Sequence, residues 1–133
     1  MTGGSIKSEP NFSPSIEAEF AGTGNDFIHN DPDGKAMRLD AHGAVRDKSG
    51  AAVYLHYTGV VNITPELGLI LTESPEAKST EFGDSFIDMK FETGDERLKT
   101  LEMGTFVGAG RFVVEKGKPV VVEYKVSKVI KGS

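Results

Sequence analysis

The sequence predicts an all-β domain, and three observations support this fold class. Short runs of alternating apolar and polar residues recur along the chain, as strands with one buried face require. Segments rich in Gly, Pro, Asn and Asp separate these runs and indicate turns. The chain also has 16 glycines among its 133 residues. Six or seven strands at such short intervals indicate a sandwich or an antiparallel barrel. The bends suggested by Gly104, Gly108 and Gly110 favour the barrel.

The first half of the chain divides into an arm, a strand and a long hairpin. Residues 1–14 are polar and contain Gly, Ser and Pro, which predicts a flexible N-terminal arm. Residues 15–133 are then expected to form a single β-barrel domain of ordinary size. Alternation over residues 15–20 predicts a short strand, which a bend at 21–28 and a turn at 30–34 follow. Residues 35–60 predict a hairpin with a five-residue connection at 46–50.

The second half begins with a helix signal and continues with strands. Thr64-Pro65-Glu66 combines an N-cap residue, a first-turn proline and an acidic side chain, which predicts a short helix near 65–71. A single helical turn is expected over 94–101. Strands are expected over residues 84–93, 104–115 and 119–130. The cleanest alternation of the chain predicts a core face made of Val120, Val122, Tyr124 and Val126.

Composition excludes several classes of function. The formal charge of −5 and the pI near 5.2 argue against a nucleic acid partner, which needs a basic surface. No apolar run of about 18 residues is present, so no membrane partner is expected. The chain has no cysteine and therefore no disulfide, thiol nucleophile or thiolate metal site. The start lacks the basic and apolar regions of a signal peptide, so a cytoplasmic location is expected.

Two blocks of sequence carry a resemblance to a known family. The first block contains Gly24-Asn25-Asp26-Phe27, Leu39-Asp40-Ala41-His42, and Ser49-Gly50-Ala51-Ala52-Val53-Tyr54 up to Gly59-Val60. The second contains Phe91-Glu92-Thr93-Gly94, Leu101, Phe106-Val107-Gly108-Ala109-Gly110-Arg111 and Val122-Glu123-Tyr124-Lys125-Val126. In order and spacing, over residues 22–127, the chain resembles domain-of-unknown-function family 3237. The resemblance implies a calycin-like antiparallel barrel with an internal cavity. Because fungal members are linked to secondary metabolism, it also suggests cofactor-free cyclisation, isomerisation or dehydration.

The chain departs from the family pattern at three places. His42-Gly43 stands where members usually have Arg-Tyr, and Thr100 stands where they usually have Trp. Members also begin with an extra glycine-rich strand pair, for which this chain offers only about twenty residues. Association with a second chain, as a homodimer, would cover the gap that this shorter start leaves in the barrel.

Four side chains of the predicted hairpin are candidate catalytic residues. Alternation places Asp40 and His42 on one face of the first strand, and Tyr54 and His56 on one face of the second. Cross-strand neighbours lie about 5 Å apart, so the four can meet. If this face turns into the cavity, His42 and His56 would be the acid and base, Asp40 would orient them or act as base, and Tyr54 would donate a hydrogen bond to a substrate oxygen. If it turns to water, the segment is an ordinary amphipathic hairpin.

Five further residues are candidates for substrate binding. Inside a barrel, Arg111 with the carboxylates Glu92 and Glu102 could hold an anionic group, although such residues more often pair at the surface. Asp26 fits a ligand contact or a turn, and Phe106 fits the core or a cavity wall.

Three of the candidate catalytic residues also have the chemistry of metal ligands. His42, His56 and Asp40 together make a His₂-carboxylate set of the kind that binds zinc or non-haem iron. The i, i+2 spacing on a strand is not a metal signature, so neither a metal nor a cofactor is expected.

The leading prediction is a cofactor-free enzyme. It would act on a small hydrophobic, oxygenated metabolite in the barrel cavity by acid/base proton transfer, as an isomerase, cyclase or lyase. A non-catalytic binding or carrier barrel is the main alternative, and a structural protein that dimerises through an open edge is the third. An enzyme requires a histidine in a concave pocket beside a carboxylate. A carrier requires an apolar lumen with the histidines outside it.

Overall fold

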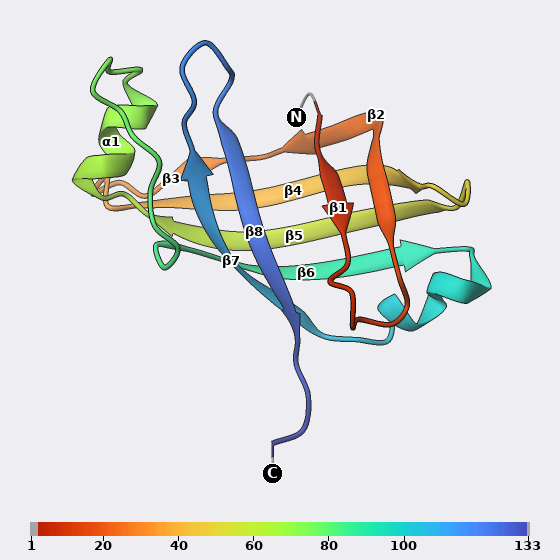
Figure 1. Ribbon diagram of the computed structural model, residues 1–133. Helices are drawn as coiled ribbons and strands as arrows, with labels where there is room; N and C mark the ends of the chain where they lie inside the picture. The colour runs from red at the N-terminus through yellow and green to blue at the C-terminus, as the bar shows by residue number, and fades with distance from the viewer. Residues whose placement is uncertain (1–2, 133) are drawn as a thin grey trace.

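A computed structural model describes residues 3–132 of the chain (Figure 1). Within them, antiparallel strands form one sheet in the order β1-β2-β4-β5-β6-β7-β8, and β3 pairs with β4 beside this path. The strands are β1 Ser5–Lys7, β2 Glu17–Asp26, β3 His29–Asn30, β4 Ala36–Asp47, β5 Ala52–Asn62, β6 Ser85–Thr93, β7 Phe106–Val113 and β8 Val121–Lys128. The helical segments are the α-helix α1, Pro65–Leu71, and the 3₁₀-helix η1, Glu96–Leu101.

The sheet curls into a half-barrel. β7 and β8 cross steeply in front of β4, β5 and β6, and the concave face of the sheet lies between these two groups of strands (Figure 1). β1 and β8 are the two edges of the sheet, and in the part of the chain described here they are not paired with each other. The prediction of an all-β antiparallel barrel-like fold with a short helix at 65–71 is therefore confirmed. Closure through a homodimer stays a prediction.

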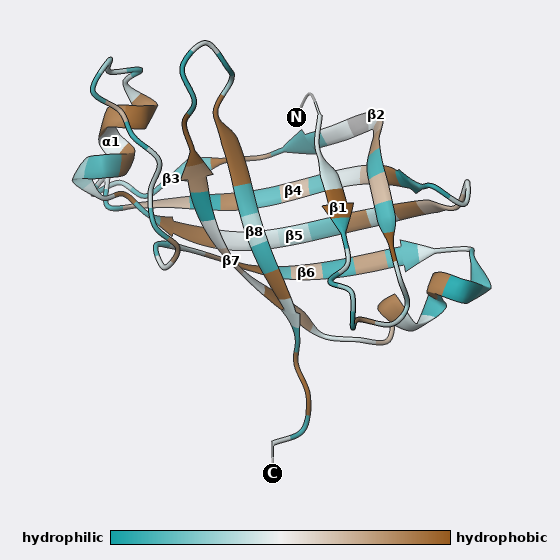
Figure 2. Ribbon diagram, in the orientation of Figure 1, coloured by the Kyte–Doolittle hydropathy of each residue, from teal (hydrophilic) through white to brown (hydrophobic). Residues whose placement is uncertain are grey.

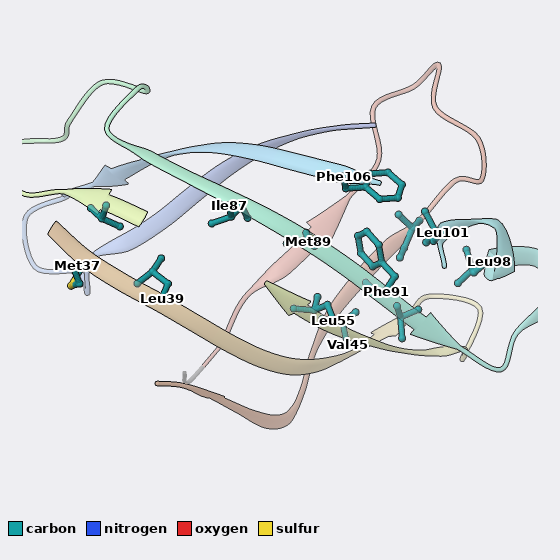
Figure 3. Close-up of a cluster of buried hydrophobic side chains, with 14 of the residues drawn as sticks. Met37, Leu39, Val45, Leu55, Ile87, Met89, Phe91, Leu98, Leu101 and Phe106 are labelled. Carbon is teal, nitrogen blue, oxygen red and sulfur yellow. The ribbon is translucent and has the colours of Figure 1, made fainter. Parts of the chain in front are cut away.

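The strands form because their apolar residues recur with a period of two and share the concave face. In β4, Met37, Leu39, Ala41 and Val45 are buried, whereas the residues of the other parity, such as Arg38, Asp40 and His42, face outward. β5 and β6 alternate in the same way. Figure 3 shows the resulting core, in which side chains from these strands meet Phe106 and the leucines of η1. Each fully buried side chain of this size contributes about 1.5–3 kcal/mol.

The helical segments pack at opposite ends of the half-barrel (Figure 1). The Thr64 hydroxyl accepts a hydrogen bond from the Leu67 amide at 3.1 Å and caps α1, as the sequence predicts. Leu67 and Ile70 then reach the core. At the other end, the Asp95 carboxylate caps η1, which buries Leu98 and Leu101.

Three expectations need correction. The segment expected to be a flexible arm contains β1, which pairs with β2. The expected bend at 21–28 belongs mostly to β2, whose register shifts between Phe20 and Gly24. The expected core face of the last strand is largely exposed, because β8 is an edge strand and little chain lies over it. Figure 2 shows apolar residues along β8 beside polar ones.

Among residues 3–132, no helix is long and apolar enough to cross a membrane.

Candidate functional site

The four predicted catalytic residues lie together on the outward face of β4 and β5. We call Asp40, His42, Tyr54 and His56 the outward cluster. His42 and His56 are direct cross-strand partners, and their rings stack with centroids 4.0 Å apart. Asp40 Oδ1 lies 2.8 Å from His56 Nε2 and 3.1 Å from His42 Nε2. The Tyr54 hydroxyl forms a hydrogen bond with His42 Nδ1. The predicted meeting of these side chains is confirmed.

The Asp40 carboxylate is held in its ionised form. The hydrogen bond from His56 is the main reason that the pKa of Asp40 lies below its usual value. Partial desolvation opposes this effect, while the charges of His42 and His56 add to it. The cluster therefore couples one carboxylate to two imidazoles.

The outward cluster does not line the concave face. His42 and His56 side chains are 32% and 35% exposed, and both alternate with residues that are buried on the other side of the sheet. Of the two orientations that the sequence allowed, the structure has the one in which this face turns to solvent. The physical reason is that a sheet with one covered face buries its apolar parity, here Leu39, Val45 and Leu55.

The predicted anion-binding group is dispersed in the structure. Glu92 is exposed on the outward face of β6, opposite Tyr54. Glu102 Oε1 accepts a hydrogen bond from the Thr93 amide at 2.6 Å, which lowers the pKa of Glu102 and fixes the end of η1. Arg111 pairs with Glu123 of β8, with 2.6 Å between Nε and Oε1. Phe106 is buried in the core against Phe91.

A second group of polar residues occupies the concave face. Tyr57 of β5 and Tyr124 of β8 meet there, with ring centroids 5.4 Å apart at 62°. Asp26 is the cross-strand partner of the buried Ala41, so it belongs to the same face. The Asp26 side chain accepts a hydrogen bond from the Asp40 amide at 3.2 Å. We call Asp26, Tyr57 and Tyr124 the concave cluster.

Burial and charge act together on the two phenols. Burial raises the pKa of Tyr57, and the Asp26 carboxylate raises it further. The pKa of Tyr124 is also raised, mainly by burial and then by Tyr57. Both hydroxyls therefore stay protonated in the folded chain at neutral pH and are hydrogen-bond donors.

Gly110 on the concave face makes room for the Tyr124 ring. Ser85, Gly110 and Tyr124 form one cross-strand row on β6, β7 and β8. A Cβ at Gly110 would lie 2.6 Å from Tyr124 Cε1 and 3.1 Å from Ser85 Oγ. Although the Tyr124 ring lies beside it, the buried Ser85 hydroxyl has no partner of hydrogen-bond geometry among the described residues. Gly110 therefore lets the Tyr124 ring lie beside the Ser85 hydroxyl.

Sequence reasoning selected Asp26 as a candidate ligand contact, but it assigned Tyr124 to a core face and did not select Tyr57. Tyr57 lies on the apolar parity of its strand with Val53 and Leu55, and Tyr124 lies between two valines. A tyrosine hydroxyl on an otherwise apolar strand face is the signal that could have identified both tyrosines as ligand contacts. Their meeting depends on the curl of the sheet, which alternation does not encode.

Comparison with known proteins agrees with the fold. The family described as "Protein of unknown function (DUF3237)" matches residues 1–129. The chain belongs to this family. No curated protein matches the sequence of this DUF3237 member.

Three solved structures are similar to this DUF3237 protein. A beta-barrel like protein from Acinetobacter baumannii AYE is 21% identical with a TM-score of 0.67, over 96% of this chain and 73% of its own. A conserved protein of unknown function from Rhodopseudomonas palustris is 23% identical with a TM-score of 0.69, over 96% and 78%. A protein with unknown function from Clostridium acetobutylicum ATCC 824 is 20% identical with a TM-score of 0.65, over 94% and 76%. At these identities the likeness shows the fold alone.

Proposed function

We propose that the concave face of the half-barrel binds a small hydrophobic, oxygenated molecule without a cofactor. The observation that carries this proposal is the pair of half-buried phenols, Tyr57 and Tyr124, which the curl of the sheet brings together. Ligand sites are typically concave and mostly apolar, with a few convergent polar groups. The concave face has this composition, and the concave cluster supplies its polar groups. The outward cluster lies on the opposite face of the sheet.

Apolar surface next to the phenols supports the proposal. Val122 and Val126 flank Tyr124 at i±2 on β8, so they share its face. Their exposed fractions are 41% and 37%, although they belong to the cleanest apolar alternation of the chain. Covering them with an apolar molecule would contribute about 25 cal/mol for each Å² removed from water.

The polar groups favour a neutral ligand that carries hydroxyl or carbonyl oxygens. Tyr57 and Tyr124 can donate hydrogen bonds to such oxygens. The Asp26 carboxylate would accept a hydrogen bond from a ligand hydroxyl but would repel a ligand carboxylate. This distinction gives the proposal a chemical test.

The test uses three probes that share the naphthalene ring and differ only in its polar substituent. We expect 2-naphthol to bind the protein in fluorescence titrations, and naphthalene and 2-naphthoate to bind more weakly. Tyr57→Phe and Tyr124→Phe should each weaken 2-naphthol binding about three- to tenfold, the value of one neutral hydrogen bond. Asp26→Asn should improve binding of 2-naphthoate.

The matched control is Tyr54→Phe, which makes the same substitution on the outward face. It should leave the affinity for 2-naphthol unchanged. Equal weakening by all three tyrosine variants, or no saturable binding of 2-naphthol, would refute a site on the concave face.

Acid/base catalysis at the outward cluster is a second candidate function. The observation that favours it is the 2.8 Å hydrogen bond between Asp40 Oδ1 and His56 Nε2, which orients one imidazole against a carboxylate. A molecule would have to approach this base from solvent.

A suitable probe is 5-nitrobenzisoxazole, whose ring opens when a base removes its C–H proton. The reaction is measured with EDTA present, so that no metal ion contributes. If His56 is a catalytic base, His56→Gln should slow the reaction, whereas His29→Gln, at an exposed histidine outside the cluster, should not. Identical rates for the wild type and both variants would exclude a catalytic base at His56.

A further inference from the structure

We propose that Asp40, His42 and His56 bind one divalent first-row transition-metal ion on the outward face of β4 and β5. Each residue offers one ligand atom, and these atoms all lie within 4.8 Å of one another. This site is separate from the concave face, so it goes beyond the proposed binding function. It also revises the expectation of a metal-free protein, which rested on sequence spacing alone.

The distances between donor atoms suit a small ion. Asp40 Oδ1 lies 2.8 Å from His56 Nε2 and 3.1 Å from His42 Nε2. Bonds of about 2.0–2.1 Å place neighbouring ligand atoms of a tetrahedral zinc ion about 3.3 Å apart. An increase of a few tenths of an ångström therefore makes room for an ion that all three donors contact.

Binding also requires a small rotation of the imidazoles. The rings of His42 and His56 are nearly parallel, with 12° between their planes, so their lone pairs do not yet converge on one point. Both side chains are about one-third exposed, which leaves them room to rotate. Their backbones stay fixed, because the two residues are paired partners in the centre of the sheet.

Tyr54 supplies the support that a ligating histidine needs. Metal-bound histidines usually donate a hydrogen bond from the N–H of the other ring nitrogen to a nearby acceptor, which fixes the tautomer. Here His42 Nδ1 already contacts the Tyr54 hydroxyl. With the proton on Nδ1 shared with Tyr54, the Nε2 lone pair of His42 is directed to the ion.

The surrounding charges favour a cation. On the neighbouring strand β6, Lys90 is the direct cross-strand partner of His56, and the carboxylates of Asp88 and Glu92 flank it two residues away on the same outward face. On β4 itself, the Arg38 guanidinium is held by the Asp31 carboxylate at 2.9 Å. The balance near the three donors is therefore negative.

The donor set selects the class of metal. Two imidazole nitrogens and one carboxylate suit zinc, cobalt, nickel or copper, whereas calcium and magnesium prefer oxygen ligands. Three protein ligands leave a fourth position for water or another small ligand, as in sites where zinc is not fully enclosed.

The experiment is a titration of the full chain with Zn²⁺ in a calorimeter, with Mg²⁺ as the comparison ion. We expect saturable binding of one Zn²⁺ per chain and no saturable heat with Mg²⁺. His42→Ala, His56→Ala and Asp40→Asn should each weaken Zn²⁺ binding at least tenfold. Tyr54→Phe, which leaves all three ligands in place, should weaken it about tenfold, because His42 Nδ1 loses the hydroxyl that orients the ring.

The matched control is His29→Ala. His29 is the third histidine of the chain, exposed on β3 and outside the cluster. Its removal should leave Zn²⁺ affinity unchanged. No saturable Zn²⁺ binding, or equal losses in the His29, His42 and His56 variants, would overturn the proposal. Circular dichroism of each variant shows whether the fold is intact, and Co²⁺ absorption bands that disappear in His56→Ala would provide independent support.

Discussion

The change of Asp47 to Asn should weaken the folded state in a pH-dependent way. Asp47 lies at the end of β4, and only 1% of its side chain is exposed. Its Oδ1 accepts a hydrogen bond from the Glu17 amide at 2.8 Å, and its Oδ2 accepts one from the Ser49 amide at 3.0 Å. Oδ2 also pairs with Arg97 at 2.8 Å. The carboxylate thus joins β2, the β4–β5 turn and η1.

The pKa of Asp47 gives the magnitude. Burial would raise this pKa, but the hydrogen bonds from Ser49 and Glu17 and the charge of Arg97 outweigh burial and lower it from 3.8 to about 2. At 1.36 kcal/mol for each pKa unit, the ionised carboxylate stabilises the fold by about 2 kcal/mol. Because the folded pKa is the lower one, this stability is present above pH 4 and is lost as the pH falls through about 2.

Urea unfolding followed by circular dichroism at pH 7, 5, 3 and 2 measures the effect. Asp47→Asn mimics the protonated carboxyl, so the variant should be less stable than the wild type by about 2 kcal/mol at pH 7 and 5. The difference should fall below about 1 kcal/mol at pH 2. The control Asp88→Asn, on the exposed face of β6, should change stability by less than about 0.5 kcal/mol. A difference for Asp47→Asn that stays constant from pH 7 to 2 would refute this electrostatic reasoning.

Three further substitutions, one with a matched control, test the packing and the helix cap. Gly59→Ala should destabilise the fold by about 3 kcal/mol, because the new Cβ would collide with the Phe86 carbonyl oxygen on β6. Unchanged stability in urea unfolding would contradict the close approach of β5 and β6 at this position. Leu98→Ala should lower the free energy of unfolding by about 3 kcal/mol, because it leaves a cavity in the core. The control Leu69→Ala removes a side chain that is 38% exposed and should lower it by under about 1 kcal/mol. Similar losses in the two variants would mean that η1 is not part of the core. Thr64→Ala should cost about 1 kcal/mol in thermal unfolding by removing the N-cap of α1, and no loss would show that this cap contributes little.

Local signals predicted the elements well. The helix start at Thr64-Pro65 is encoded by the residues that cap it, and α1 lies where they indicate. The alternation of β4 and β5 fixed which residues share a face, so the pairing of His42 with His56 could be anticipated. These features depend on neighbours in sequence or on one hairpin.

Features that depend on distant strands could not be predicted in the same way. Alternation defines two faces but does not say which one is covered, so the outward cluster was equally compatible with a cavity. Val122 and Val126 have the pattern of core residues, yet their burial depends on chain that would have to lie over an edge strand. The contact between Tyr57 and Tyr124 joins strands far apart in the sheet and arises only from its curl.

Mapping of 2-naphthol by ¹H–¹⁵N NMR tests the proposed binding face most directly. The amides of Tyr57, Val122, Tyr124 and Val126 should shift with 2-naphthol in a saturable way, while those of His42 and His56 should stay in place. Shifts centred on the two histidines, or spread evenly over both faces of the sheet, would contradict a binding site built around the two half-buried phenols.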